Sequence, residues 1–174
     1  MDTLTADKLK ELLNLKAHPE GGFFVQSDRS ETTVRTDRHH ANDGIRYAAT
    51  TIYFLLTPES PGGMFCKNMS EIMHIWCAGG SQVHTFILPD GSVTERVLGP
   101  RLDLGQSLQV LCPAGAWKTS RLLDPNVYSL ITEVVYPGWE LCDWEMGRTD
   151  KLVKIFPQHR ELIEKYTHKE DVSF

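Results

Sequence analysis

The chain has 174 residues, of which 41% are hydrophobic and 24% charged, a composition typical of one globular domain with its own core. Its net charge of −5 excludes a strong basic field for binding nucleic acid or anionic membrane. The first residues lack the apolar run of a signal peptide, and no stretch is apolar for long enough to cross a bilayer. We therefore expect a single cytoplasmic domain over residues 1–174.

The first predicted element is a helix over Thr5–Leu15, with Thr5 as its N-cap and an apolar face of leucines. The motif HPEGG at residues 18–22 then turns the chain. Ten short β-like segments follow, separated by turns rich in Gly, Pro, Asp and Asn, and they predict an antiparallel barrel or sandwich. The predicted strands are Phe23–Ser27, Thr50–Leu56, Gly63–Lys67, Glu71–Cys77, Gln82–Leu88, Ser92–Leu98, Ser107–Cys112, Trp117–Ser120, Tyr128–Val135 and Glu140–Met146.

Two segments lie outside these predicted strands. Arg29–Gly44 is expected to be a mobile loop, and Thr149–Tyr166 predicts one or two helices broken at Pro157. The four cysteines are widely spaced, so we expect reduced and mostly buried thiols.

Five segments together resemble a small family of cupins of unknown function that carries an HPEGG signature. They are HPEGGFF at 18–24, TTIYFLL at 50–56, SEIMHIWCAGG at 70–80, LGQSLQVLCPAGAWK at 104–118 and YPGWELCDWEM at 136–146. The resemblance implies a mainly β double-stranded β-helix, the cupin jelly roll, with an N-terminal helix and C-terminal helices. It also implies a homodimer and a relation in fold to sugar-nucleotide epimerases and seed storage globulins.

Cupins with a metal carry His-x-His followed by Glu and Gly, and then Pro-x-Gly-x-x-His. Here the three histidine positions hold Met64, Cys66 and Lys118, while Glu71 remains. Relatives more often have His-Arg at Cys66 and Lys67 and Gln at Lys118. The remaining candidates are Cys66, Glu71 and either His74 or His84, but strand alternation places Glu71 and His74 on opposite faces. We expect no metal, no cofactor, and a Cys66 that is a small buried apolar residue.

The candidate ligand-binding residues surround the lost metal position. Lys118 either faces the barrel lumen, where it pairs with Glu71 and attracts an anion, or extends to the barrel mouth. Trp117 is either a stacking face for a flat ring or a barrel plug, and Gln109, Tyr128 and His84 are candidate pocket walls. Arg46, with Arg29, Arg35, Arg38, His39 and His40, belongs either to a solvated loop or to a flap over an anionic ligand.

These features favour a metal-independent cupin that binds a small molecule, with a nucleotide or a nucleotide-sugar as the expected ligand. One alternative is a sugar-nucleotide isomerase or epimerase that uses His84 or His74 as base and Tyr128 as acid. A second alternative is a degenerate cupin with a protein-interaction role. In the expected dimer, Phe23–Ser27 or the tail crosses to the partner, because an open jelly roll has unpaired strand edges.

Overall fold

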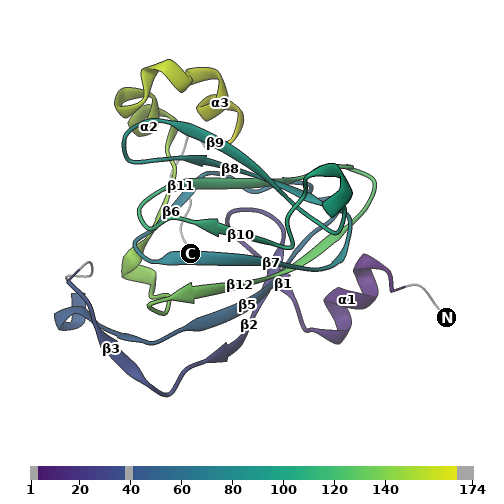
Figure 1. Ribbon diagram of the computed structural model, residues 1–174, viewed down its shortest axis with the longest axis horizontal. Coiled ribbons are helices and arrows are strands. Elements are labelled where there is room, and N and C mark those ends of the chain that lie inside the picture. Colours follow the sequence, from purple (N-terminus) through teal and green to yellow (C-terminus); the bar gives the residue numbers. More distant parts are fainter. Residues whose placement is uncertain (1–3, 38–40, 168–174) are drawn as a thin grey trace.

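The computed structural model describes residues 4–37 and 41–167. Their strands form two antiparallel sheets and a separate hairpin (Figure 1). The six-stranded sheet has the order β1-β2-β5-β12-β7-β10, and the five-stranded sheet has the order β13-β6-β11-β8-β9. The expected jelly roll is therefore confirmed.

Most of the strands lie where the alternation of the sequence predicts them. The strands of the six-stranded sheet are β1 (Lys16–Ala17), β2 (Phe23–Arg29), β5 (Thr50–Leu56), β7 (Glu71–Gly79), β10 (Gln109–Cys112) and β12 (Ser129–Tyr136). Those of the five-stranded sheet are β6 (Cys66–Asn68), β8 (Gln82–Ile87), β9 (Val93–Leu98), β11 (Trp117–Leu122) and β13 (Trp144–Met146).

The main core lies between the two sheets. Ile72 of β7, Ile131 and Val135 of β12, Phe86 of β8 and Leu122 of β11 belong to one buried cluster. Successive residues of a strand point to opposite faces, so these positions show which side chains enter the barrel. On β7 the inward residues include Ile72 and His74, and on β11 they include Lys118 and Leu122.

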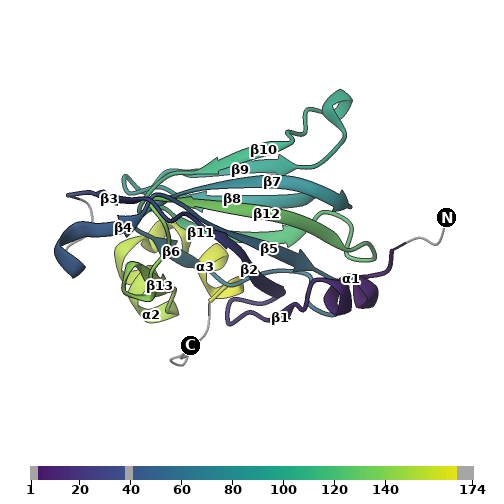
Figure 2. The same ribbon diagram turned by 90° about the horizontal axis from the view of Figure 1, so that it is seen from below.

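The helices cover the outside of the barrel. α1 (Ala6–Leu12) begins at Thr5, whose side chain accepts a hydrogen bond from the Lys8 N–H as the sequence predicts. α2 (Thr149–Ile155) and α3 (Arg160–Lys165) are separated by the 3-10 helix η4 (Pro157–His159), so Pro157 ends α2 as expected. They pack on the outer face of the five-stranded sheet through a second buried cluster that contains Trp117 and Ile87 (Figure 2).

The segment expected to be a mobile loop contains regular structure. β3 (Thr33–Arg35) pairs with β4 (Ile45–Tyr47), and the 3-10 helix η1 (Ala41–Gly44) leads into β4. This hairpin extends away from the barrel (Figures 1 and 2). Two further 3-10 helices are η2 (Leu102–Leu104) and η3 (Leu141–Asp143). Among the described residues, no helix is long and apolar enough to span a bilayer.

Candidate functional site

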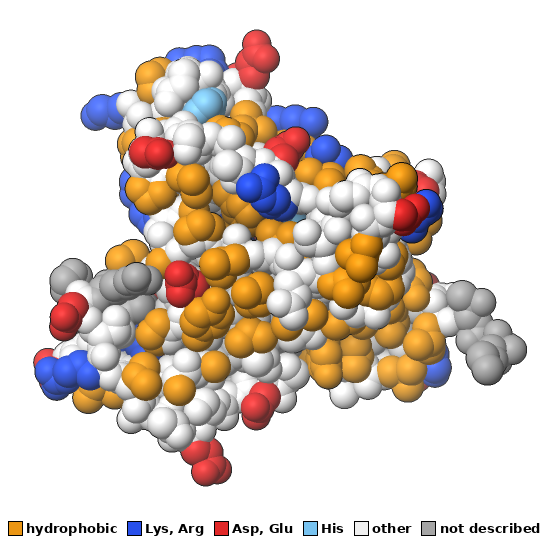
Figure 3. Space-filling view, viewed as in Figure 1, with side chains coloured by type: hydrophobic (Ala, Val, Ile, Leu, Met, Phe, Trp, Pro, Cys, Tyr) orange, Lys and Arg blue, Asp and Glu red, His pale blue; other side chains and the backbone are white. Residues whose placement is uncertain are grey.

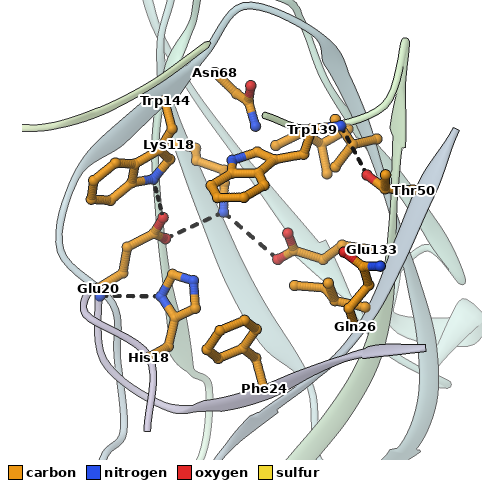
Figure 4. A pocket seen from close by; sticks show the side chains of 13 residues that line it. His18, Glu20, Phe24, Gln26, Thr50, Asn68, Lys118, Glu133, Trp139 and Trp144 are labelled. Carbon is orange, nitrogen blue, oxygen red and sulfur yellow. Dashed lines mark hydrogen bonds and ion pairs between the residues drawn. The ribbon is translucent and has the colours of Figure 1, made fainter. Parts of the chain in front are cut away.

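A cavity of about 90 Å³ lies inside the barrel, beside the strands β2, β5, β12 and β11. Its walls combine aromatic, aliphatic and charged side chains (Figure 4). The titratable side chains and the tryptophans of the lining are His18, Glu20, Lys118, Glu133, Trp139 and Trp144. A concave site with an apolar wall and a few convergent polar groups is the usual form of a small-molecule site.

The HPEGG turn carries Glu20 into this cavity. Gly21 has a φ of +108°, and a Cβ there would lie 2.5 Å from the Gly62 carbonyl oxygen, so only glycine fits. The Glu20 N–H donates a hydrogen bond to His18 Nδ1 at 3.1 Å, and the Glu20 carbonyl oxygen accepts from the Met64 N–H at 2.7 Å. The motif therefore fixes the backbone from which two polar side chains reach the cavity.

Lys118 lies between two carboxyl groups at the floor of the cavity. Its Nζ lies 3.5 Å from Glu20 Oε2 and 3.6 Å from Glu133 Oε1 (Figure 4). The three side chains come from the HPEGG turn, from β11 and from β12. Lys118 is 13% exposed and both carboxyl groups are less so, which makes this a buried charge cluster.

Two tryptophans form the aromatic wall. The Trp144 indole N–H donates a hydrogen bond to Glu20 Oε1 at 2.7 Å, which fixes that ring relative to the charge cluster. The Trp139 backbone N–H donates to Thr50 Oγ1 at 2.9 Å. Indole faces held in place next to carboxylates offer stacking and hydrogen bonding to the same ligand.

The environment of Glu20 favours its charged form. Burial opposes ionisation, but the attraction of Lys118 and hydrogen bonds from the Cys66 thiol and the Trp144 indole outweigh it and lower the pKa of Glu20 to about 2. Burial also disfavours a charged Lys118, yet the acidic groups around it, which include Cys66, Glu133 and Glu20 in order of their effect, hold its pKa well above the usual value. These two residues form the ion pair of the cavity.

Glu133 has the opposite environment. Burial raises its pKa, and repulsion from Glu20 adds to this effect, while Lys118 offsets only part of it. Glu133 Oε1 also lies 3.5 Å from Nε2 of His74, which is fully buried. Burial, together with repulsion from Lys118, lowers the pKa of His74 to about 3, so this imidazole is neutral.

A second buried histidine lies behind His74. The ring centroids of His74 and His84 are 4.4 Å apart, and His84 is 1% exposed. Burial lowers the pKa of His84 well below its usual value. Neither ring nitrogen of His84 has a hydrogen-bond partner among the described residues. His84 belongs to the barrel interior beneath the cavity and does not line it.

Of the residues predicted to bind a ligand, only Lys118 lines the cavity. Glu71 was expected to face the lumen and pair with Lys118, and this is wrong, because the inward residues of β7 are Ile72 and His74. Trp117 is the neighbour of Lys118 on β11 and must face the other way. It packs against the C-terminal helices, with Lys67 Nζ 4.8 Å from its ring centroid.

Three further predicted residues lie elsewhere. Gln109 is exposed on β10, because the buried neighbours Val110 and Cys112 take the inward positions. Tyr128 packs on the cluster beneath α1, which contains Leu9 and Leu130. The structure places His84 and Tyr128 in different parts of the core, so they form no acid–base pair.

Arg46 is a structural residue. Its Nε and Nη2 donate to the two carboxylate oxygens of Asp143 at 2.6 and 2.8 Å, and its side chain is fully buried. This pair joins β4 to η3, so Arg46 does not reach into the cavity mouth. Arg38, His39 and His40 of the expected flap lie outside the described residues.

Sequence reasoning missed most of the charge cluster. Glu20 stands in the HPEGG motif, which predicts a turn but does not show where its carboxyl group lies. Glu133 is the one charged residue in the apolar run SLITEVVY of β12. A single acid in a buried strand is the signal that identifies it, because an isolated buried charge requires a partner.

The residues at the lost metal position do not fit a transition metal. The Lys118 ammonium stands between the two carboxyl groups where a cation would bind, and burial raises the pKa of the Cys66 thiol well above its usual value. A neutral thiol and an ammonium are not ligands, since metal binding requires deprotonated donors. Among the described residues, no three His, Cys, Asp or Glu side chains are grouped for a metal ion.

Comparison with known proteins places the chain in a family. The family model described as Cupin superfamily (DUF985) matches residues 7–147. An uncharacterized protein of Saccharomyces cerevisiae is 37% identical over 148 residues, which cover 78% of this chain and 73% of that protein.

Solved structures have a fold similar to that of this chain. A hypothetical protein from Leishmania major has a TM-score of 0.87 and 29% identity, covering 95% of this chain and all of that one. A protein from Shewanella oneidensis has a TM-score of 0.85 and 30% identity, covering 97% of this chain and all of that one. Oxalate decarboxylase from Bacillus subtilis, with a TM-score of 0.55 and 12% identity over 90% of this chain and 38% of that one, shares the fold alone. The chain belongs to the DUF985 family of the cupin superfamily.

Proposed function

We propose that this cupin binds a small, neutral, polyhydroxylated ligand in the barrel cavity, without a metal. The observation that carries the proposal is the charge cluster under the aromatic wall. One ammonium, Lys118, lies between two carboxyl groups, and the indoles of Trp139 and Trp144 stand beside them. Carboxylates accept hydrogen bonds from hydroxyl groups, and an indole face packs against the flat apolar side of a ring.

The size of the cavity limits the buried part of the ligand. A volume of about 90 Å³ is well below the roughly 300–1,000 Å³ of sites that enclose drug-sized ligands. If one water needs about 15 Å³, the cavity has room for roughly six water-sized groups. The ring atoms of one sugar match this number of groups, so the cavity would enclose part of a single sugar, whereas a nucleotide is too large to be enclosed.

The charge of the cavity also favours a neutral group over a phosphate. Of the described lining residues, Lys118 alone carries a full positive charge, and it is already paired with Glu20. A phosphate at the floor would meet the Glu20 carboxylate, and the like charges would repel it. In a nucleotide-sugar, the sugar would therefore enter the cavity, and the nucleotide would remain outside its mouth.

An isomerase or epimerase remains the second candidate, and the opposite pKa shifts of Glu20 and Glu133 favour it. The alternative of a degenerate protein-interaction domain is less well supported. A lumen filled by Met64, Met73 and Trp117 would favour it, and none of these three is among the residues that line the cavity.

Calorimetric titration tests the proposal with three ligand sets: free sugars, nucleotide-sugars, and the same nucleotides without sugar. We expect binding in the first two sets and none in the third. Gln26→Ala, at the lining, should weaken binding by about two- to tenfold, the worth of one hydrogen bond. Gln109→Ala is the matched control on the exposed face and should leave affinity unchanged. Binding of nucleotides alone, or equal effects of the two variants, would contradict the proposal.

A further inference from the structure

The two carboxyl groups that flank Lys118 have different hydrogen-bond environments. Glu20 accepts from the Trp144 indole N–H at Oε1 and faces the Lys118 ammonium at Oε2. The Cys66 thiol is a third donor to this carboxyl. A group surrounded by donors is an acceptor, so the hydrogen bonds select the carboxylate form of Glu20.

The environment of Glu133 follows from the tautomer of His74. His74 Nδ1 lies 3.2 Å from the Val110 carbonyl oxygen, which only accepts, so Nδ1 must carry the proton. His74 Nε2 then carries no proton and can only accept a hydrogen bond through its lone pair, and no described residue donates one to it. This lone pair faces Glu133 Oε1 at 3.5 Å, and the contact becomes favourable only when the carboxyl carries a proton.

We infer that Glu133 is a carboxylic acid and Glu20 a carboxylate, and that they act as the acid–base pair for proton transfer on a sugar carbonyl bound between them. This inference rests on the proposed sugar site and adds the reaction to it. The shifts of the pKa values agree in direction, since that of Glu20 is lowered and that of Glu133 is raised. Two titratable groups driven apart in this way are the usual mark of an acid and a base.

The titratable groups near Glu133 come from several elements. They are Lys118 of β11, Glu20 and His18 of the HPEGG turn, His74 of β7, and the thiols of Cys66 on β6 and Cys112 on β10, whose pKa values burial raises. His74 is neutral, and burial lowers the pKa of His18 as well. The positive charge near Glu133 therefore comes from Lys118, which Glu20 already neutralises.

The proton transfer balances without any further reactant. The Glu20 carboxylate removes the proton from the carbon next to the carbonyl, and the C–H electron pair forms the carbon–carbon double bond. The carbonyl π pair accepts the proton of Glu133, which gives an enediol, a protonated Glu20 and an ionised Glu133. The neighbouring hydroxyl then returns its proton to Glu133, and Glu20 protonates the adjacent carbon, which completes an aldose–ketose isomerisation. Lys118 stabilises the negative charge that develops on oxygen, the task of an oxyanion donor.

The protonation states are tested on the ligand-free protein. Carbon-13 NMR of protein labelled at the Glu side-chain carboxyl gives the state of each group, with Glu20→Gln and Glu133→Gln assigning the two signals. At pH 7 we expect a protonated carboxyl for Glu133 and an ionised one for Glu20. At that pH, Glu133→Gln should lower the melting temperature less than Glu20→Gln, because only the latter removes a charged partner of Lys118. Two ionised carboxyl groups would overturn the inference.

The reaction is tested by incubating those sugars that bind in the titration in D₂O and following deuterium at the carbon next to the carbonyl. Wild-type protein should incorporate deuterium, whereas both Gln variants should lose at least tenfold in rate. Glu133→Gln should still bind sugar, which separates loss of proton transfer from loss of the site. If no sugar binds, the proposed function fails. If sugars bind but no deuterium is incorporated by the wild type, the ligand proposal stands and the acid–base inference fails.

Discussion

Lys118 Nζ lies 3.5 Å from Glu20 Oε2, although the two residues are almost a hundred positions apart in the chain. One belongs to the HPEGG turn and the other to the strand that follows PAGAW, so the two distinctive motifs of the sequence meet at a single ion pair. In a cupin with a metal, the second motif supplies an imidazole ligand. Here an ammonium occupies that position between two carboxyl groups, so a cationic side chain stands where a metal ion would otherwise bind.

The Glu20 ion pair predicts an acid-labile contribution to stability. The pKa of Glu20 is about 2 in the folded chain against an ordinary value of 4.5. A carboxyl whose pKa is lowered by folding stabilises the protein at pH values above the pKa that it has in the unfolded chain. This contribution is lost as the pH falls from about 4.5 to 2. The shift corresponds to about 3 kcal/mol.

Urea unfolding of wild type and Glu20→Gln at pH 6 and pH 3 measures this contribution. The wild type should lose more free energy of unfolding than the variant between the two pH values. The control is Glu59→Gln, whose side chain is 61% exposed, and it should follow the wild type. Parallel pH curves for wild type and Glu20→Gln would contradict the prediction.

Arg46 predicts a large effect on stability rather than on binding. Arg46→Met leaves the Asp143 carboxylate buried without its bidentate partner, which typically costs about 3–5 kcal/mol. Arg46→Lys should recover only part of this, because an ammonium cannot make the forked contact. Ligand affinity of the folded fraction should not change.

Arg101 provides a matched control for Arg46. It makes the same forked contact with Asp103, at 2.8 and 2.7 Å, but both side chains are more than half exposed. Solvent screens such a pair, so Arg101→Met should leave the urea midpoint almost unchanged. Equal effects of Arg46→Met and Arg101→Met would show that burial of the Arg46 pair does not matter.

Local sequence signals predicted the fold well because they depend on neighbouring residues. Thr5 caps α1 because its side chain accepts a hydrogen bond from a free backbone N–H. Pro157 ends α2 because proline has no backbone N–H to donate. The strands follow from the alternation of side chains with a period of two residues. The site was harder, because a strand pattern shows which residues share a face but not which face is inside. Glu71 and His74 were correctly placed on opposite faces, and the wrong face was taken as the lumen.

Other errors concern contacts between residues that are far apart in the sequence. Arg46 and Asp143 are separated by 97 positions, and no local pattern indicates that they pair. Trp117 and Lys118 are adjacent, so alternation alone excludes both from one pocket, and this criterion was available from the sequence. The Arg29–Gly44 segment was predicted to be a loop because its residues are mostly polar, so the short strand β3 shows no alternation of apolar and polar side chains.

We predict that the protein is a homodimer. β2 pairs with β5 along one edge and with β1 only at Phe23 and Phe24 along the other, so the crossing of Phe23–Ser27 to a partner stays a prediction, and the tail beyond Thr167 lies outside the described residues. β10 is an unpaired edge of the six-stranded sheet, and hydrophobic side chains gather over β7 and β12 on the same face (Figure 3). Such an edge favours association.

Light scattering at micromolar concentration should give twice the chain mass of 19.7 kDa. Leu111→Glu places a charge on the outward side of β10, where Leu111 is 42% exposed, and should give monomers. Leu12→Glu on α1, at 57% exposure, is the control and should leave the mass unchanged. A wild-type mass of one chain would contradict the prediction.

We also predict that the purified protein contains no stoichiometric transition metal, because an ammonium and a neutral thiol occupy two of the former ligand positions. Elemental analysis should show far less than one zinc, iron, nickel or manganese per chain. A chelator should not lower the melting temperature. About one metal per chain, with a fall in melting temperature on chelation, would refute this.

The final prediction concerns Lys118→Met, which removes the only full positive charge among the described lining residues of the cavity. Glu20 and Glu133 then remain buried without their cation, and the pKa of Glu20 should rise above its unfolded value. A carboxyl whose pKa is raised by folding destabilises the charged protein, so stability of the variant should fall as the pH rises from 5 to 8. The loss at pH 8 should reach about 3–5 kcal/mol, as for other broken buried pairs.

Urea unfolding at pH 5 and pH 8 measures this effect, with Lys151→Met as control. Lys151 also forms an ion pair, with Glu145, but its side chain is 49% exposed, so its removal should cost little and show no such pH dependence. Sugar affinity of folded Lys118→Met should fall at least tenfold, because the cluster that orients Glu20 and Glu133 is lost. A variant as stable as wild type at pH 8, with unchanged affinity, would show that Lys118 neither holds the two carboxyl groups nor serves the ligand.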